Sequence, residues 1–181
     1  AGRVETEIRS FKAGQLDKTR NYTVYLKPGN RSLVLFRSPA ERGQKLLMQG
    51  DDFWLMMPNS QRPLRITPMQ KLLGDASTGD IATMSWAEDY TGTVAGTEDC
   101  GEPKQACVHL SLAANRKGVT YQRVELWLGK ARHEPIKAEL YVQSDKLAKK
   151  ARFVTDKPAA PTMVTEMLLQ DQLTSNKETR V

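Results

Sequence analysis

Cysteine, histidine and long apolar runs are scarce in this chain. It holds two cysteines and two histidines among 181 residues, and its longest clean apolar run is the stretch 53–58. The scarcity of cysteine excludes a disulfide-dense scaffold, and two histidines argue against a Cys/His zinc site. A spanning helix needs roughly 18 apolar residues, so a transmembrane anchor within this chain is excluded. With 39% hydrophobic and 27% charged residues, the chain is too apolar to be disordered.

Runs of basic residues are also missing. The formal net charge is +6, but it is uneven: residues 1–50 carry +6, residues 51–100 carry −5 and residues 101–181 carry +5, counted from the sequence. No block of five to eight lysines and arginines occurs, so we expect no nucleic acid partner. The densest basic group is either a solvated strand edge or a weak site for anionic lipid headgroups; it contains Lys146, Lys149, Lys150 and Arg152.

The first residues form neither a charged leader nor an apolar one, so we expect a processed chain or a trimmed one. Cys100 and Cys107 flank residues 101–106, a turn-like stretch inside a predicted β-hairpin. Two cysteines at these positions can approach closely enough for a disulfide. That disulfide predicts an oxidising compartment. The alternative is two unrelated thiols in a reducing cytosol.

Period-2 alternation of apolar and polar residues dominates the rest of the chain and predicts β-strands. A Pro28-Gly29-Asn30 turn joins the first clear pair into a hairpin. Short turns between successive strands predict an antiparallel meander of about ten strands, and a sheet that wide curls. The fold class is therefore mainly β (α+β), a large curved sheet or partial barrel. The expected strands are 4–11, 20–27, 31–37, 44–49, 52–57, 90–95, 106–113, 120–128, 135–143, 149–155 and 162–170.

Residues 67–89 break this alternation. Pro68 suits the first position of a helix, and Gly74 would end it. Thr78 or Asp80 could cap a second helix. We predict two short helices over 67–89 that cross the apolar face of the sheet as a lid.

Two short helices cannot cover such a sheet. A helix is about 10 Å wide, whereas ten strands about 4.8 Å apart span several times that width before curling. The remaining apolar face either closes on itself as a packed small barrel, is covered by residues absent from this chain, or lines a cleft for an apolar ligand.

No catalytic or cofactor motif is convincing. His109 and His133 lie on or near different predicted strands, and no G-x-S-x-G, P-loop, G-x-G-x-x-G or EF-hand pattern occurs. Adjacent acidic pairs such as Glu88-Asp89 would point to opposite faces of a strand. We therefore predict no enzyme, no catalytic residue, no metal and no cofactor. Seven methionines and three tryptophans offer instead either ordinary core filling or a deformable apolar pocket.

The stretch 32–90 resembles the LolA-like outer-membrane lipoprotein-sorting family. The resemblance lies in Arg37-Ser38-Pro39, in the segments 50–58 and 79–90, and in downstream elements around 121–124 and 135–139. It implies a half-open β-barrel with a helical lid. It also implies a non-enzymatic periplasmic carrier or receptor for acylated lipoproteins or other lipids.

In the sorting carrier an arginine before a proline helps to hold the lid closed, and the resemblance gives this lid-latch role to Arg37. Two features depart from the family. Residues 4–11 already predict a strand where the family carries a helix, and the family continues into another strand beyond Val181. We therefore expect one lipid-binding domain over 1–181, trimmed at one or both ends, with the lid at 67–89.

The leading hypothesis is a monomeric carrier in the periplasm of a Gram-negative type envelope. It would bind acyl chains of a lipoprotein or lipid and exchange them with an inner-membrane transporter and an outer-membrane acceptor. The alternative is a periplasmic sensor that binds a lipoprotein or peptide and signals to a membrane partner. The residues predicted to line the apolar cleft are Tyr22, Val24, Leu33, Leu35, Met48, Trp54, Met56, Leu72, Ile81, Met84, Trp86, Leu126 and Leu140.

Overall fold

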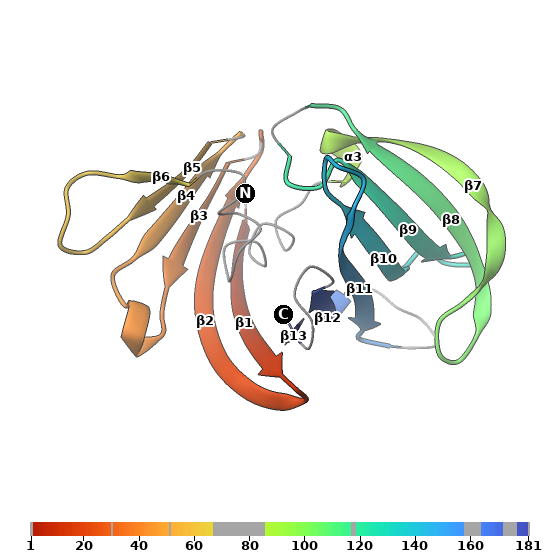
Figure 1. Cartoon of the computed structure of the whole chain (residues 1–181), viewed down its shortest axis with the longest axis horizontal. Coiled ribbons are helices and arrows are strands. Elements are labelled where there is room, and N and C mark those ends of the chain that lie inside the picture. The colour runs from red at the N-terminus through yellow and green to blue at the C-terminus, as the bar shows by residue number, and fades with distance from the viewer. Residues whose placement is uncertain are drawn as a thin grey trace.

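The computed structural model of the chain is mainly β, with almost no helix (Figure 1). It describes residues 2–29, 31–50, 52–66, 86–116, 119–157, 164–171 and 177–180. These residues form one 13-stranded antiparallel sheet. The strands are β1 (Gly2–Lys12), β2 (Gln15–Lys27), β3 (Arg31–Phe36), β4 (Lys45–Gln49), β5 (Asp52–Met56), β6 (Leu64–Ile66), β7 (Tyr90–Cys100), β8 (Gln105–Ala114), β9 (Arg123–Gly129), β10 (Pro135–Tyr141), β11 (Leu147–Thr155), β12 (Val164–Asp171) and β13 (Lys177–Arg180).

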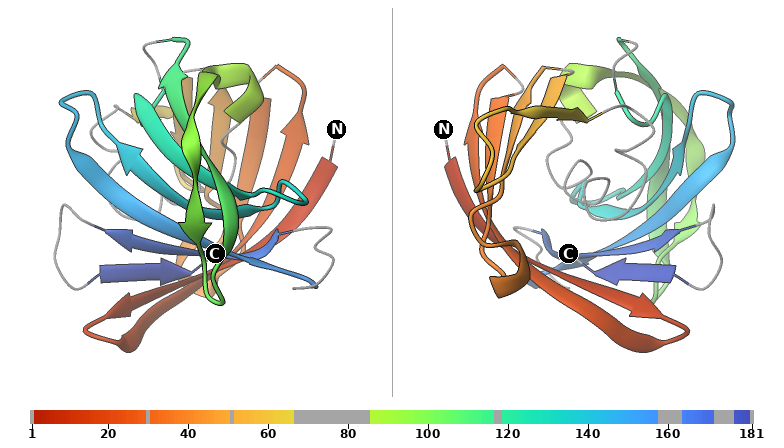
Figure 2. Two further views of the ribbon diagram at one scale, coloured as in Figure 1. Left: turned by 90° about the vertical axis from the view of Figure 1, so that its right-hand side faces the viewer. Right: turned by 60° about the vertical axis from the view of Figure 1, so that its left-hand side comes forward.

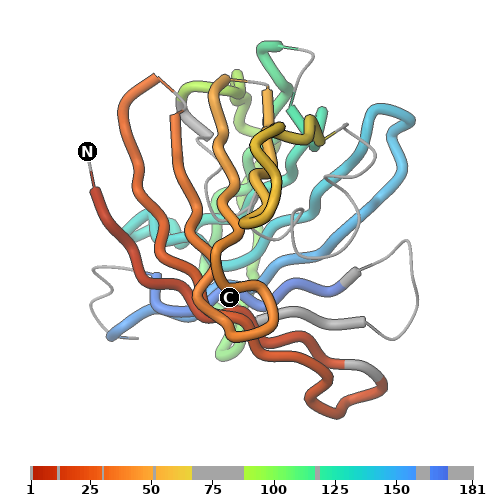
Figure 3. The backbone as a smooth tube through the Cα atoms, turned by 90° about the vertical axis from the view of Figure 1, so that its left-hand side faces the viewer, coloured from red at the N-terminus to blue at the C-terminus, as the bar shows by residue number. Residues whose placement is uncertain are grey.

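The strands pair with their sequence neighbours, except where β1 pairs with β13. That pairing joins a left half, β1–β6, to a right half, β7–β13 (Figure 1). The two halves curve toward one another (Figure 2), and Figure 3 shows the left half from its own side. Among the described residues β6 and β7 are the free edges of the sheet. The sheet is therefore an open, curved structure that does not close into a barrel.

Most of the predicted strands are present, including the hairpin of β2 and β3 and the long meander β7–β12. The alternation pattern did not predict the short strands β6 and β13. It also predicted strands at 4–11 and 20–27 that are shorter than β1 and β2. β1 and β2 continue to a tight turn at Ala13 and Gly14, whose φ angles are 52° and 79°. Both angles are left-handed, a conformation that glycine adopts readily and alanine rarely does.

The predicted helical lid over 67–89 lies largely outside the described residues. Within them, α3 (Trp86–Asp89) is the single α-helix, and η1 (Pro39–Glu41) is a short 3-10 turn. No helix in the described part of the chain is long and apolar enough to cross a membrane.

Register fixes which side chains share a face of the sheet. In β2–β5, Val24 lies opposite Val34, Val34 opposite Leu46 and Leu46 opposite Leu55. In β8–β11, Leu110 lies opposite Leu126, which lies opposite Ala138, which lies opposite Ala151. We call this side the apolar face. The opposite side, which carries Arg9 and Leu168 around β13, is the outer face.

Candidate functional site

The apolar face of the left half holds one buried cluster. Ring centroids of Tyr22 and Phe36 lie 5.1 Å apart at 86°, an edge-to-face contact. Side chains at every second position of a strand point to the same face of the sheet, and this brings the members of the cluster together. The buried members of this left cluster are Ile8, Tyr22, Val24, Val34, Leu46, Met48 and Phe53, with Leu26, Phe36, Leu55 and Ile66 packed against them.

The apolar face of the right half holds a second, separate cluster. The Tyr90 hydroxyl donates to the carbonyl oxygen of Tyr121 at 2.6 Å, which ties the start of β7 to the segment before β9. Small alanines on β10 and β11 let larger neighbours pack closely. The buried members of this right cluster are Tyr90, Leu112, Tyr121, Val124, Leu126, Ala138, Leu140, Ala148, Ala151, Met167 and Leu169.

A polar group lies at one edge of the left cluster. Arg20 forms an ion pair with the buried Glu41, and Arg20 shares the apolar face with Tyr22. The Tyr22 hydroxyl is buried and has no hydrogen-bond partner among the described residues. Burial is the main cause that raises the pKa of Tyr22; the nearby Glu41 carboxylate adds to the shift and Arg20 opposes it. A neutral hydroxyl is thus held between the apolar cluster and the Arg20–Glu41 ion pair.

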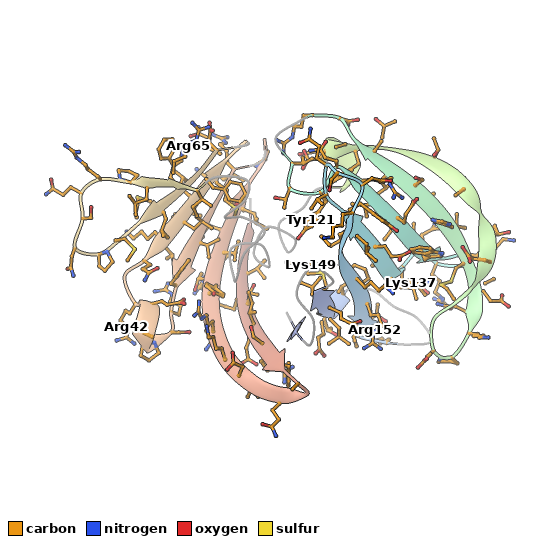
Figure 4. All side chains as sticks on the ribbon, in the orientation of Figure 1. Arg42, Arg65, Tyr121, Lys137, Lys149 and Arg152 are labelled. Carbon is orange, nitrogen blue, oxygen red and sulfur yellow. A yellow bond between two sulfur atoms is a disulfide. The ribbon has the colours of Figure 1, made fainter. Side chains whose placement is uncertain are left out.

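The basic group predicted around residue 150 divides between the two faces. Lys149 is buried and lies opposite Leu140 in register, on the apolar face. Lys150 and Arg152 are exposed. Figure 4 shows Lys149 and Tyr121 nearer the middle of the molecule than Lys137 and Arg152. Alternation along β11 predicts that Lys149 points away from Lys150 and Arg152, but only the pairing with Leu140 shows that Lys149 is the one on the apolar face.

A shallow groove of about 210 Å³ runs over β10–β12. Its charged side chains, Lys137, Lys150, Arg152 and Glu139, alternate with the buried alanines of the right cluster and so belong to the outer face. The groove is small and mixed in charge. It is therefore a different surface from the two apolar clusters.

The structure places five of the thirteen predicted cleft residues on the apolar face, in two separate clusters: Tyr22, Val24 and Met48 in the left cluster, Leu126 and Leu140 in the right one. It places four others on the outer face of the left half: Leu33, Leu35, Trp54 and Met56. Leu72, Ile81 and Met84 lie outside the described residues, and so does the side chain of Trp86. Whether any of them contacts a ligand stays a prediction.

The four outer residues were grouped with the cleft because each strand was interpreted by itself. Leu33 and Leu35 share a face as expected, but Val34, on the other face, is the residue that pairs with Val24. A shift of one position moves a side chain to the other face of a sheet. Sequence reasoning also missed Ile8, Phe53 and Met167 as members of the clusters. Their alternation was visible in the sequence, but the pairing that decides their face was not.

Arg37 follows β3, and its Nε donates to Oγ1 of Thr23 at 3.0 Å. Thr23 lies opposite Leu35 in register and therefore belongs to the outer face. Any contact of Arg37 with residues 67–85 lies outside the described residues, so its latch role stays a prediction.

Cys100 and Cys107 form a disulfide, with their Cα atoms 5.8 Å apart. Both sulfurs are buried beside Trp127 and Ile136. Trp127 donates from Nε1 to Glu98 at 2.8 Å and stacks on His109 at 4.2 Å. The disulfide therefore closes the β7–β8 turn covalently, and packing against Trp127 and Ile136 holds this turn on β9 and β10.

Known proteins share this architecture. A LolA superfamily protein from Nitrosomonas europaea is 30% identical, with a TM-score of 0.83 over 98% of this chain and 81% of that one. A putative outer-membrane lipoprotein-sorting protein domain from Vibrio parahaemolyticus is 20% identical (TM-score 0.72; 99% and 82% covered). A DUF1329 family protein from Desulfovibrio piger is 22% identical (TM-score 0.74; 98% and 82% covered).

A model for a family of uncharacterized proteins matches residues 29–181, and no curated protein sequence matches the chain. The open, curved antiparallel sheet with an apolar face is the fold that this chain shares with these proteins. The chain belongs to the LolA superfamily. This confirms the family predicted from the sequence.

Proposed function

We propose that this protein is a non-enzymatic carrier that binds acyl chains of a lipoprotein or another lipid against the apolar face of its sheet. The observation that carries the proposal is that one face of an open sheet carries an apolar cluster in each of its two halves. A sheet that packs only for stability needs one core. Here the apolar side chains form two separate clusters, one in each half.

Desolvation would supply the affinity. Each methylene transferred from water to an apolar surface contributes about 0.8 kcal/mol, so a few buried methylenes already give useful binding. The Met48 and Met167 side chains, one in each cluster, adapt to chains of different shape because thioethers are flexible and polarisable. Capture and release then need a conformational change and no covalent chemistry.

The membership of the superfamily supports a lipid or lipoprotein as the ligand. We further propose that the protein works in a periplasm, where the Cys100–Cys107 disulfide would persist. There it would act as a monomer that takes cargo from an inner-membrane transporter and delivers it to an outer-membrane acceptor.

Native mass spectrometry of freshly purified protein tests the proposal directly. We expect peaks heavier than the chain by the mass of a bound lipid, which disappear after extraction with organic solvent and return when an acylated probe is added. Protein that carries no lipid and takes up no acylated probe would contradict the proposal.

Photo-crosslinking identifies the face that holds the acyl chain. We would place a photoreactive phenylalanine analogue at Phe36 in the left half or at Phe153 in the right half, both partly buried on the apolar face. Tyr25, exposed on the outer face, is the matched control. In vesicle-free solution an acylated probe should label the first two variants and spare the third. Equal labelling at Tyr25 would show that the binding face is wrongly assigned.

A further inference from the structure

The outer face of the left half carries a row of large apolar side chains. Tyr25 lies opposite Leu33, Leu33 opposite Leu47 and Leu47 opposite Trp54, so the four cross β2–β5 in register. We call them the outer row. Leu35 and Met56 occupy the next row on the same face. These side chains are directed away from the cluster that contains Val24 and Val34.

Water reaches this row. Tyr25 is 39% exposed, and the other members are partly exposed. An antiparallel sheet with one buried face normally presents polar residues on the other. The right half has Glu125, Lys137 and Glu139 on its outer face, and the large apolar side chain beside them, Trp127, is buried. In the left half the outer row is partly exposed, whereas in the right half the large apolar Trp127 on the same face is buried.

Basic side chains surround the row. Lys27, Arg31 and Lys45 lie beside it on the same face, and the guanidinium of Arg65 lies 5.9 Å from the Trp54 ring. Asp52 is the one carboxylate in the sequences of β3–β6, and it pairs with Arg65 at 2.6 Å. Figure 4 shows Arg65 at the top of the left half. On the other side of the row, β1 places Arg3 opposite Tyr25 and Glu5 opposite Thr23, and these two side chains form an ion pair. The surface is therefore an apolar strip whose border carries more cations than carboxylates.

We propose that the outer row docks this protein on the surface of an anionic lipid bilayer. Tyr and Trp favour the level of the headgroups, where an apolar ring and a polar edge are both satisfied. Lys and Arg around them can reach phosphate groups while their stems lie on apolar surface. A second copy is a poorer occupant, since a two-fold contact would bring the two positive borders together.

The inference rests on the proposed function, because a carrier of acyl chains has to meet a bilayer or a protein in it. Docking through the outer row would leave the apolar face free to exchange cargo. Each basic side chain near an anionic surface contributes roughly fivefold in affinity. Lys27, Arg31 and Lys45 together would then give about a hundredfold preference for anionic over neutral membranes.

Co-sedimentation with vesicles tests this docking. We expect the protein to bind vesicles of phosphatidylglycerol mixed with phosphatidylcholine, to ignore pure phosphatidylcholine, and to dissociate as salt rises. Equal binding to both vesicles, or to neither, would overturn the proposal. Displacement by inorganic phosphate, with none by chloride at equal ionic strength, would overturn it in favour of a free anion site.

Two charge-matched pairs of substitutions locate the surface. Lys27→Gln with Lys45→Gln removes two cations beside the outer row and should weaken binding about twenty- to thirtyfold. Lys150→Gln with Arg152→Gln removes two exposed cations from the outer face of the right half and should weaken it less than threefold, about the effect of net charge alone. Equal losses in both pairs would overturn the outer row as the docking site.

An apolar pair completes the test. Tyr25→Ser with Trp54→Ser should weaken vesicle binding about tenfold or more. Leu16→Ser with Val94→Ser changes residues that are 56% and 69% exposed elsewhere and should have little effect. Because substitution of Trp54 can also disturb folding, circular dichroism accompanies each variant. Quenching of Trp54 by brominated lipids, taken as the quenching of wild type that is lost in Trp54→Phe, is a second measurement. A folded outer-row pair that binds as wild type, or a Trp54 that brominated lipids do not quench, would overturn the proposal.

This experiment can fail separately from the proposed function. Acyl binding is measured without vesicles, at Phe36 and Phe153 on the apolar face. Loss of vesicle binding with normal crosslinking would reject docking alone. Vesicle binding with no acyl uptake would reject the carrier function that motivates the docking.

Discussion

Arg37 and Thr23 are joined by a hydrogen bond on the outer face, from Arg37 Nε to Thr23 Oγ1 at 3.0 Å. Thr23 is buried, and its hydroxyl donates in turn to the carboxylate of Glu5 at 3.0 Å. The three side chains thus connect β1, β2 and the residue after β3. Arg37 was predicted to hold a lid, but its described side-chain contact is with the sheet itself.

We expect this contact to stabilise the fold modestly. Thr23→Val keeps the shape of the side chain and removes both hydrogen bonds, and it should lower the free energy of unfolding by about 0.5–1.5 kcal/mol. Arg37→Leu should cost a similar amount. Because both changes remove the same bond, the double variant should lose about 1 kcal/mol less than the sum of the two.

Urea denaturation measures these values. Additive losses would show that the Arg37–Thr23 bond contributes nothing. Hydrogen exchange over residues 67–85 in Arg37→Leu is a separate readout. Faster exchange there, with unchanged exchange in β2 and β3, would support the latch role that the family resemblance implies.

Because of Tyr22, we expect the stability of the folded protein to depend on pH in the alkaline range. Its pKa is raised in the folded protein, so the folded state keeps this proton at pH values where an unfolded tyrosine, with a pKa near 10, has lost it. The unfolded state then binds fewer protons, and stability falls as pH rises above about 10, by up to 1.4 kcal/mol per pH unit. Tyr22→Phe should have a flatter profile in this range.

The same variant removes a buried hydroxyl with no partner among the described residues. At neutral pH, Tyr22→Phe should therefore raise the free energy of unfolding by about 1 kcal/mol. Thermal melts of wild type and variant across alkaline pH check both statements. Parallel profiles for the two proteins would contradict the raised pKa of Tyr22.

The sequence predicted the class of fold because period-2 alternation and short turns are local. These two local signals were sufficient to predict the hairpin at Pro28-Gly29-Asn30 and the meander after Tyr90. β13 could not be predicted in this way, since its four residues pair with β1 from the far end of the chain. That long-range pairing is what joins the two halves into one sheet.

The candidate site was harder to predict than the fold. Alternation shows that Leu33 and Leu35 share a face, but only the pairing of Val34 with Val24 shows which face it is. The left half has apolar residues on both faces, so composition could not separate them. In the right half, Leu126 and Leu140 lie on one face and their polar neighbours, Glu125 and Glu139, on the other, so alternation and pairing agree there.

The Cys100–Cys107 disulfide should raise the free energy of unfolding, although the loop that it closes is short. The two cysteines are seven positions apart, and closing a loop of that size restricts the unfolded chain by about 2–3 kcal/mol. Replacing both with serine should lower the free energy of unfolding by that amount, and reduction of the wild type should do the same. Intact mass without reductant should be about two daltons below the dithiol value.

Free thiols in protein exported to a periplasm and unfolded without reductant would contradict this expectation. They would also remove the disulfide as an argument for an oxidising compartment. A matched control is Ser111→Ala, a change on the same strand that leaves the disulfide in place. It should shift the denaturation midpoint only slightly, since Ser111 makes one partly exposed hydrogen bond to Glu125.

Trp127 and Glu98 supply the last prediction. The indole Nε1 donates to Glu98 Oε1 at 2.8 Å, and Trp127 is buried. Glu98→Leu removes the acceptor and leaves the buried N–H unpaired, which should cost about 1–3 kcal/mol of unfolding free energy. Glu98→Gln keeps an acceptor oxygen in place and should cost less than about 1 kcal/mol.

Trp127→Phe distinguishes the effect of losing this hydrogen bond from the effect of losing the negative charge of Glu98. It retains an aromatic ring that can stack on His109 and removes the N–H, so Glu98→Leu should cost less in that background than in wild type. Urea denaturation of the four proteins in the cycle gives the coupling free energy. A coupling near zero would mean that the bond adds nothing to stability. The buried disulfide beside Trp127 would then hold the β7–β8 turn by packing and covalent closure alone.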